Sequence, residues 1–269
     1  MDDDPAALGR SNGIEFCRES TRWGRGGQLY EPDGIVLFAT GSWVPSNCNG
    51  AIRVDPSVDP TEVIARADSF FGDLSRGYDV VCAVGGRDDD LAVACERAGL
   101  QVYGAPEPQM LCTERPPELA TAVDIRPVVT AADVAAFVSV QADAYAHGMP
   151  PGEVAAVFSR PHRLVGAPNV RAVVAYAEGR PVAGALLLLS HGVGGVYWVG
   201  TVASARRRGF GDHVTRAVTR LGFELGAGAV VLDASPEGLG VYERLGYREV
   251  GRTRRYVRLK PTRGRRRRR

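Results

Sequence analysis

The sequence predicts a mixed α/β protein in which two related units follow one another along 269 residues. Apolar runs with strand character alternate with amphipathic stretches over most of the chain, which is typical of a sheet covered by helices. A basic segment with two glycines, residues 206–211, separates one such strand from one such helix. Residues 96–104 align with residues 243–251 without a gap, which indicates an internal repeat. The length is sufficient for two hydrophobic cores.

Each element of the C-terminal half is predicted from apolar periodicity and from prolines and glycines between the periodic segments. The first strand precedes a helix, and a second helical region is interrupted by prolines. A three-stranded meander, a helix, a strand and a short helix follow, before a last pair of strands. In order, the predicted ranges are 124–128, 131–146, 148–164, 170–177, 182–190, 195–202, the helix after 211, 229–233, the short helix ending at Gly246, and 247–259.

Residues 206–211 read Arg-Arg-Arg-Gly-Phe-Gly, and an apolar helical stripe follows them. The two glycines therefore stand where the helix begins. At a helix N-terminus the backbone N–H groups lack partners and the helix dipole is positive, so an anion is stabilised there. Glycine lets the main chain approach that anion closely. The segment predicts a phosphate site, although an ordinary strand-to-helix turn would show the same pattern.

A second motif lies about thirty residues later. Residues 232–247 read as a strand end, a serine cap with proline at the first helical position, a short helix and a terminating glycine. Together the two segments resemble the acetyl-CoA-binding core of the GNAT superfamily of N-acetyltransferases. Residues 206–211 resemble its Gln/Arg-x-x-Gly-x-Gly/Ala loop, and residues 241–247 resemble its Tyr-Glu-x-x-Gly-Phe/Tyr helix end. The resemblance covers residues 124–260.

The resemblance implies a GNAT fold with two tandem GNAT-like domains, the N-terminal one degenerate. It also implies acetyl-CoA as the acyl donor, with no metal. The pantetheine arm would lie in the gap between two diverging strands, along Val199, Gly200 and Thr201. The backbone of the loop would bind the pyrophosphate through Arg207, Arg208, Gly209, Phe210, Gly211 and Asp212. Ser235 stands where many relatives place an asparagine that contacts the cofactor, and a simple helix cap explains it equally well.

Transfer in this family is direct, and a tyrosine protonates the departing coenzyme A thiolate. Tyr242 matches that tyrosine, and the alternative is a core aromatic on a short helix. The general base is not identified, because the expected glutamate on the fourth strand is absent. Asp143, His147 and His191 are candidates, and each also fits an ordinary surface residue. Water, or an amine that arrives neutral, would serve as well.

The N-terminal half repeats the second part of the same element order. Strands are predicted at 34–39, 50–54 and 79–84, and helices at 60–74 and 89–97. Where the phosphate loop would be, Val58-Asp59-Pro60-Thr61-Glu62-Val63 has no glycine and two carboxylates. Cys95 stands where Tyr242 would be. We therefore expect this half not to bind acetyl-CoA but to act as a scaffold, as one wall of the substrate pocket. The predicted domains are 1–118 and 119–260, followed by a disordered arginine-rich tail at 261–269.

Composition restricts the location and the partners. The longest apolar run is far shorter than a membrane span and the N-terminus is acidic, so we expect a cytoplasmic protein without membrane contact. The five cysteines match no zinc spacing and are expected to be reduced. Net charge is +2, and the arginines of the tail leave the rest of the chain mildly acidic. The tail is expected to be solvated, with transient nucleic-acid contact as the alternative.

The predicted function is acetyl-CoA-dependent N-acetyl transfer to a small-molecule amine. A protein or peptide N-acetyltransferase is one alternative, and a non-catalytic acyl-CoA-binding sensor is another. A sensor could keep the phosphate loop and lose the tyrosine acid, but both motifs are present here.

Overall fold

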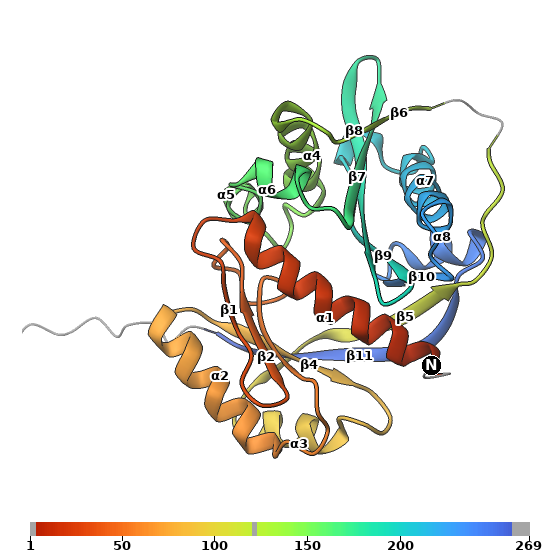
Figure 1. Ribbon diagram of the computed structural model, residues 1–269. Helices are drawn as coiled ribbons and strands as arrows, with labels where there is room; N and C mark the ends of the chain where they lie inside the picture. Colours follow the sequence, from red (N-terminus) through yellow and green to blue (C-terminus); the bar gives the residue numbers. More distant parts are fainter. Residues whose placement is uncertain (1–3, 120–122, 260–269) are drawn as a thin grey trace, which may run out of the picture.

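The computed structural model describes residues 4–119 and 123–259, whose strands form one continuous mixed sheet (Figure 1). The N-terminal half consists of α1 (Pro5–Trp23), β1 (Gln28–Tyr30), β2 (Ile35–Ala39), β3 (Asn49–Arg53), α2 (Pro60–Leu74), β4 (Tyr78–Ala83), α3 (Asp89–Arg97) and β5 (Gln101–Cys112). The C-terminal half consists of β6 (Asp124–Pro127), α4 (Ala131–Ala144), α5 (Pro151–Val157), α6 (Pro161–Val165), β7 (Val170–Ala177), β8 (Arg180–Ser190), β9 (Val193–Thr201), α7 (Phe210–Glu224), β10 (Ala229–Asp233), α8 (Leu239–Arg244) and β11 (Arg248–Arg258).

The two halves exchange their last strands. The strand order is β1-β2-β3-β4-β11-β5-β10-β9-β8-β7-β6. β11, the end of the C-terminal half, pairs antiparallel with β4, and β5, the end of the N-terminal half, pairs antiparallel with β10. β11 and β5 also pair with each other at the centre of the sheet. Each half therefore completes the sheet of the other, and the predicted division at 118/119 falls in the connection that links β5 to β6.

The same order of elements occurs twice. In the N-terminal half, three antiparallel strands lead through α2 to β4, α3 and the exchanged strand β5. In the C-terminal half, β7, β8 and β9 lead through α7 to β10, α8 and the exchanged strand β11. In both halves the strands that flank the first of these helices are parallel neighbours, as a crossover connection requires. Figure 1 shows the two copies on opposite sides of the central strands.

Most predicted elements are confirmed, but α1, β1 and β5 were not predicted. α1 begins at Pro5, where the carboxylate of Asp4 accepts a hydrogen bond from the Ala6 N–H at 3.0 Å. Its buried positions are largely polar and include Asn12, Glu19, Ser20 and Thr21. An apolar stripe is therefore missing, although the helix crosses the middle of the sheet (Figure 1).

The predicted last pair of strands is wrong, because residues 248–258 form the single strand β11. In the structure, a register shift against β5 lies between Glu249 and Gly251, so the chain bulges there and continues. A hairpin partner is unnecessary, because strands of the N-terminal half pair with both edges of β11.

Helices cover both faces of the C-terminal part of the sheet. α7 and α8 pack on one face through a cluster that includes Phe210, Val214 and Tyr242. α4, α5 and α6 pack on the other face, where Trp23 of α1 joins their cluster. α2 and α3 cover the N-terminal strands. No helix within 4–119 or 123–259 is long and apolar enough to cross a membrane, and the predicted tail at 261–269 lies outside the described residues.

Candidate active site

The two parallel strands of the C-terminal half diverge after a short contact. β9 pairs with β10 only at Val193–Gly195 against Ala229–Val231. Beyond Gly195, β9 continues to Thr201 with β8 as its only partner, while β10 continues along β5. The predicted residues Val199, Gly200 and Thr201 therefore lie on one wall of the divergence, where an extended ligand has access to strand backbone.

A bulge in β9 marks the start of the divergent segment. Trp198 has a φ of 51°, and the register against β8 shifts opposite this point, between Gly184 and Leu186. A left-handed bulky residue is strained and must be held by its surroundings. The hydroxyl of Tyr145, at the end of α4, donates a 3.0 Å hydrogen bond to the carbonyl of Val199, the next residue. The bulge is therefore fixed from the α4 side.

The predicted phosphate loop ends at a helix without a side-chain cap. Gly209 is the N-cap of α7, with a φ of 84°, and no side chain bonds to the first turn. The first backbone hydrogen bond of the helix runs from the His213 N–H to the Gly209 carbonyl at 3.1 Å. The N–H groups of Phe210, Gly211 and Asp212 precede it and have no intrahelical acceptor. The helix end is therefore open to an anion.

Arg206, the first arginine of the motif, turns away from that anion site. Its side chain donates to the carbonyl of Thr201 at 3.3 Å and to the carbonyl of Ala144 at 3.0 Å. Asp143 accepts a 2.6 Å hydrogen bond from the Ala203 N–H, in the short turn just before the loop. Both side chains fix the loop against α4. Asp143 therefore positions the loop and is not a free carboxylate for the role of base.

The remaining polar residues of the loop differ in their exposure. Arg207 and Arg208 are exposed, and the guanidinium of Arg208 lies 5.3 Å from the centre of the Phe210 ring. The carboxylate of Asp212 pairs with Arg216 at 3.1 Å, one turn further along α7. This ion pair compensates the negative charge that Asp212 brings to the helix end.

Tyr242 lies on α8 with 7% of its surface exposed, and its ring packs edge-on against Tyr247 at a centroid distance of 6.0 Å. Its hydroxyl oxygen forms no hydrogen bond within the described residues, and it is not fully buried. It therefore reaches solvent. Burial raises the pKa of Tyr242 to about 12, so the phenol stays protonated at neutral pH.

Ser235 is not the N-cap of α8, which corrects the prediction. α8 begins only at Leu239, after Gly238 as N-cap. The hydroxyl of Ser235 instead accepts a 3.2 Å hydrogen bond from the Gly238 N–H and so closes the turn that leads into the helix. Pro236 therefore belongs to this turn and not to the first turn of the helix.

The two histidine candidates for the base differ in location. His147 is exposed in the segment that follows α4. His191 is exposed in the turn between β8 and β9, next to the end of β9 that still pairs with β10. The divergence opens at the opposite end of β9, so His191 does not face it.

Sequence reasoning missed a polar group at the end of β10. Asp233 is its last residue and lines a pocket together with Tyr197 of β9, Gln109 of β5, and Gly9 and Gly13 of α1. The only sequence signal is a carboxylate directly after an apolar strand. The helix that forms the opposite wall could not be assigned from the sequence, and the strand exchange that brings Gln109 beside Asp233 could not be predicted.

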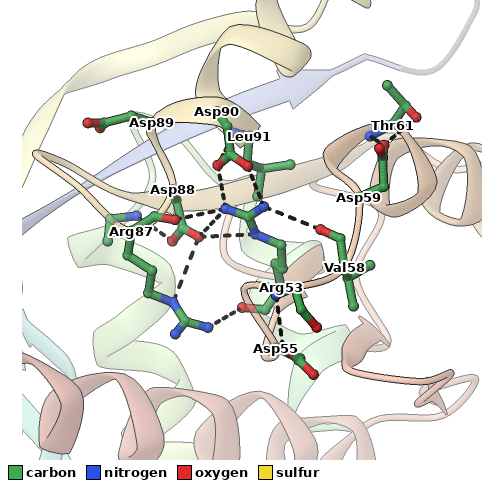
Figure 2. Close-up of polar contacts among 12 residues, drawn as sticks. Arg53, Asp55, Val58, Asp59, Thr61, Arg87, Asp88, Asp89, Asp90 and Leu91 are labelled. Atoms are coloured by element: carbon green, nitrogen blue, oxygen red, sulfur yellow. Dashed lines mark hydrogen bonds and ion pairs between the residues drawn. The ribbon is translucent and has the colours of Figure 1, made fainter.

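The corresponding place in the N-terminal half is filled by side chains (Figure 2). β3 pairs with β4 at only two positions, and Arg53, the last residue of β3, is 2% exposed. Its guanidinium lies 2.6 Å from the Asp90 carboxylate and 3.0 Å from that of Asp88. Asp88 also accepts the N–H of Ala83 at the end of β4. This Arg53 cluster connects the ends of the two strands.

The helix end of the N-terminal half is capped by its own carboxylate. Asp59 is the N-cap of α2 and accepts hydrogen bonds from the Thr61 N–H at 2.7 Å and from the Thr61 hydroxyl at 2.5 Å. These bonds lower the pKa of Asp59, so it stays ionised. The anion position of this helix is thus already occupied by the chain itself.

Diverging parallel strands beside an uncapped helix end, with a solvent-accessible tyrosine on the next helix, are the features that the resemblance predicted for an acyltransferase. Residues 139–247 match the sequence model of the family described as acetyltransferase (GNAT) family. The chain thus contains a GNAT acetyltransferase domain, an enzyme domain of the acyltransferase class, in less than half of its length.

Solved structures resemble the whole chain. A GCN5-related N-acetyltransferase from Kribbella flavida is 22% identical with a TM-score of 0.68, over 97% of this chain and 96% of that one. A GCN5-related N-acetyltransferase from Sphaerobacter thermophilus is 17% identical with a TM-score of 0.60, over 94% and 91%. A functionally unknown conserved protein from Staphylococcus epidermidis is 16% identical with a TM-score of 0.63, over 87% and 95%. These likenesses establish the fold across both halves. Among curated proteins, no match to the chain is found.

Proposed function

We propose that this protein transfers the acetyl group of acetyl-CoA directly to the amine of a small molecule. The observation that carries the proposal is the junction of three features: the divergence of β9 from β10, the uncapped N-terminus of α7, and the accessible hydroxyl of Tyr242.

The residues present fit acetyl-CoA. Three unpartnered N–H groups and two exposed arginines at the start of α7 suit a pyrophosphate. At Gly211 a Cβ would lie 3.4 Å from the Thr201 hydroxyl, so glycine leaves room between the helix end and the end of β9. The wall formed by Val199, Gly200 and Thr201 suits the pantetheine arm. When bound, acetyl-CoA supplies a thioester carbonyl that accepts an amine and a thiolate that leaves.

Tyr242 is proposed as the proton donor to the departing thiolate. Its pKa of about 12 keeps the phenol protonated throughout the neutral range, and its hydroxyl is free to donate. A non-catalytic sensor would have no need of such a donor.

The cover provided by α1 supports a small acceptor over a peptide. α1 contacts β8, β9 and β10 and lies over the pocket at the end of β10. Phe16 of this helix stacks on Tyr197 at a centroid distance of 3.8 Å. A peptide acceptor would need an open groove where this helix lies.

The test is a screen of small primary amines with acetyl-CoA, followed through release of the coenzyme A thiol. Amine-dependent thiol release, with an N-acetylated product identified by mass spectrometry, is the expected result. If acetyl-CoA binds but only a peptide panel releases thiol, the acceptor class is wrong. If acetyl-CoA binds and no acceptor releases thiol, the sensor alternative is favoured.

A further inference from the structure

The pocket beneath α1 contains polar groups that the proposed function has not yet used. α1 contributes Gly9 and Gly13, which face β5 and β10 one helical turn apart. A Cβ at Gly13 would meet nothing within 4 Å, and at Gly9 the nearest atoms lie at 3.9 Å or more. Glycine is unfavourable inside a helix, and here it leaves open space above the strand ends.

Polar contacts hold α1 over this pocket. The side-chain amide of Asn12 donates to the Ser190 hydroxyl at 2.9 Å and to the Leu188 carbonyl at 3.2 Å. The Tyr197 hydroxyl donates to the Asn12 Oδ1 at 2.7 Å, so the phenol is engaged in this contact. The contacts join the N-terminal helix to β8 and β9, and the pocket is therefore a fixed feature between the two halves.

Asp233 lies where the pocket meets the strand divergence. It is two residues beyond Val231, the last β10 residue paired with β9, and so shares the α1 face of the sheet with Val231. Tyr197, which lines the same pocket, stands on the diverging strand opposite. Asp233 is partly exposed to solvent, and the residues that line the pocket surround the rest of it. This placement leaves the carboxylate accessible to a small solute.

The charged groups around Asp233 include more carboxylates than guanidinium groups. Arg255 of β11 pairs with Asp79 at 3.0 Å and with Glu107 at 3.4 Å, so two carboxylates share its charge. Asp233 itself forms no ion pair within the residues that the structure describes. Three carboxylates thus face a single guanidinium, an arrangement that favours a cationic solute.

The same neighbours set the pKa of Asp233. The surrounding protein raises it by desolvation, Arg255 lowers it, Glu107 raises it, and a hydrogen bond from Gln109 lowers it, which leaves the value at about 6. Tyr197 and Cys17 also face this carboxylate, and burial raises the pKa of both, so they are neutral at this pH. Asp233 is therefore ionised at neutral pH and can still accept a proton.

We propose that Asp233 binds the ammonium group of the acceptor in the pocket beneath α1 and removes its proton, and that the acceptors are small primary amines bearing further positive charge. This inference rests on the proposed function. One N–H bond of the ammonium breaks and its proton passes to the Asp233 carboxylate, which later releases it to solvent. The neutral nitrogen forms the C–N bond as the C–S bond breaks, and it loses a second proton to solvent. Tyr242 protonates the sulfur and regains a proton from solvent, so one proton is released overall.

The probes are 1,5-diaminopentane and 5-aminopentanoate, which share a chain length and differ in the charge of the second group. Calorimetry with acetyl-CoA comes first, because failure of wild type to bind it would refute the proposed function. Given binding, we expect thiol release with the diamine to exceed that with the amino acid at least tenfold. Equal rates, or a preference for the amino acid, would overturn the assigned acceptor class.

The variants separate a base from a structural carboxylate. Asp233→Asn should lower kcat/KM for the diamine by about 10²-fold or more and leave the Kd of acetyl-CoA unchanged. Wild-type kcat/KM should fall as pH decreases through about 6, because Asp233 becomes protonated. Glu107→Gln, the matched neutralisation, should move this limb to lower pH, because Glu107 raises the pKa of Asp233. An Asp233→Asn enzyme with wild-type rate and the same acidic limb would refute the base.

A measurement independent of turnover covers the case in which neither probe reacts. Carbon-detected NMR of the carboxyl groups, with Asp233→Asn for assignment, should show one aspartate that titrates near pH 6. Addition of 1,5-diaminopentane in the presence of coenzyme A should move this midpoint to lower pH, since a bound cation favours the carboxylate. A midpoint that the diamine leaves unchanged would overturn the proposal.

Discussion

The helices α7 and α2 occupy the same place in the two repeats and begin in opposite ways. α7 has Gly209 as its N-cap and no side-chain cap, whereas Asp59 caps α2 through the Thr61 N–H. The adjacent strands diverge in both halves, but only in the N-terminal half does an ion-paired arginine, Arg53, connect the strand ends. In the N-terminal half, the Asp59 carboxylate thus occupies the position that would bind the phosphates of coenzyme A. The Arg53 guanidinium occupies the position that would bind its pantetheine arm.

This difference shows that two halves can share a topology without sharing the features for a ligand. The order β3-α2-β4-α3-β5 needs only apolar packing and strand pairing, which the N-terminal half retains in full. A ligand site needs unpaired polar groups, and these are costly to leave without a partner. Asp59 and Arg53 supply such partners within the N-terminal half, and the exchange of β5 and β11 pairs a strand of each half with strands of the other.

Disruption of the open helix end should have the largest effect. Gly209→Val combined with Gly211→Val adds a β-branched side chain to a residue with a φ of 84° and crowds the loop, so acetyl-CoA binding should become undetectable by calorimetry. Gly226→Val is the control, because Gly226 has a φ of 92° at the other end of α7 and a Cβ there would meet no atom within 4 Å. Unaltered affinity in the double variant would show that the loop does not bind the coenzyme.

Removal of the proposed acid should come next. Tyr242→Phe keeps the ring and its packing, so turnover should fall by about 10²-fold or more while acetyl-CoA affinity stays near wild type. Tyr247→Phe is the matched control. It loses a 2.7 Å contact with the Thr219 hydroxyl in the core, so it should cost about 1 kcal/mol of stability and leave turnover unchanged. Equal kinetics in the two variants would make Tyr242 a core residue.

Removal of Arg53, which connects the strand ends of the N-terminal half, should affect the stability of the fold and not acetyl-CoA binding. Arg53→Met leaves the buried Asp88 carboxylate without its main partner, so the free energy of unfolding should fall by about 3 kcal/mol in urea titration. Arg66→Met, which removes a surface ion pair with Glu62, should leave the free energy of unfolding nearly unchanged. Titration of the Arg53 variant should still give one acetyl-CoA per chain. A second equivalent would mean that Arg53 alone had excluded it.

The smallest effect is expected at the α2 cap. Asp59→Ala removes the acceptor for the Thr61 N–H and should lower the free energy of unfolding slightly in the same assay. Acetyl-CoA stoichiometry should remain one, because the Arg53 cluster still connects the strand ends. If the Asp59→Ala variant binds a second acetyl-CoA, then the Asp59 carboxylate alone accounts for the difference in binding between the two halves.

The sequence by itself determined the local features on which the site depends. Each of these features can be predicted from its own segment, because it depends on local backbone chemistry. They are the glycines at 209 and 211, the apolar stripe of α7 and the tyrosine of α8. The sequence also indicated that the Asp59 carboxylate disfavours phosphates, but its role as the N-cap of α2 was not predicted.

The tertiary structure alone decided which strands pair and what covers them. The local sequences of β5 and β11 favour strands but do not specify which strands they pair with. The exchange therefore depends on long-range pairing that no local pattern encodes. α1 was missed because its buried side chains are polar, and such positions become favourable only once Ser190 and Tyr197 supply their hydrogen bonds. Asp233 gained its role in the same way, since its surroundings come from α1, β5, β9 and β11, far apart in the chain and adjacent only after folding.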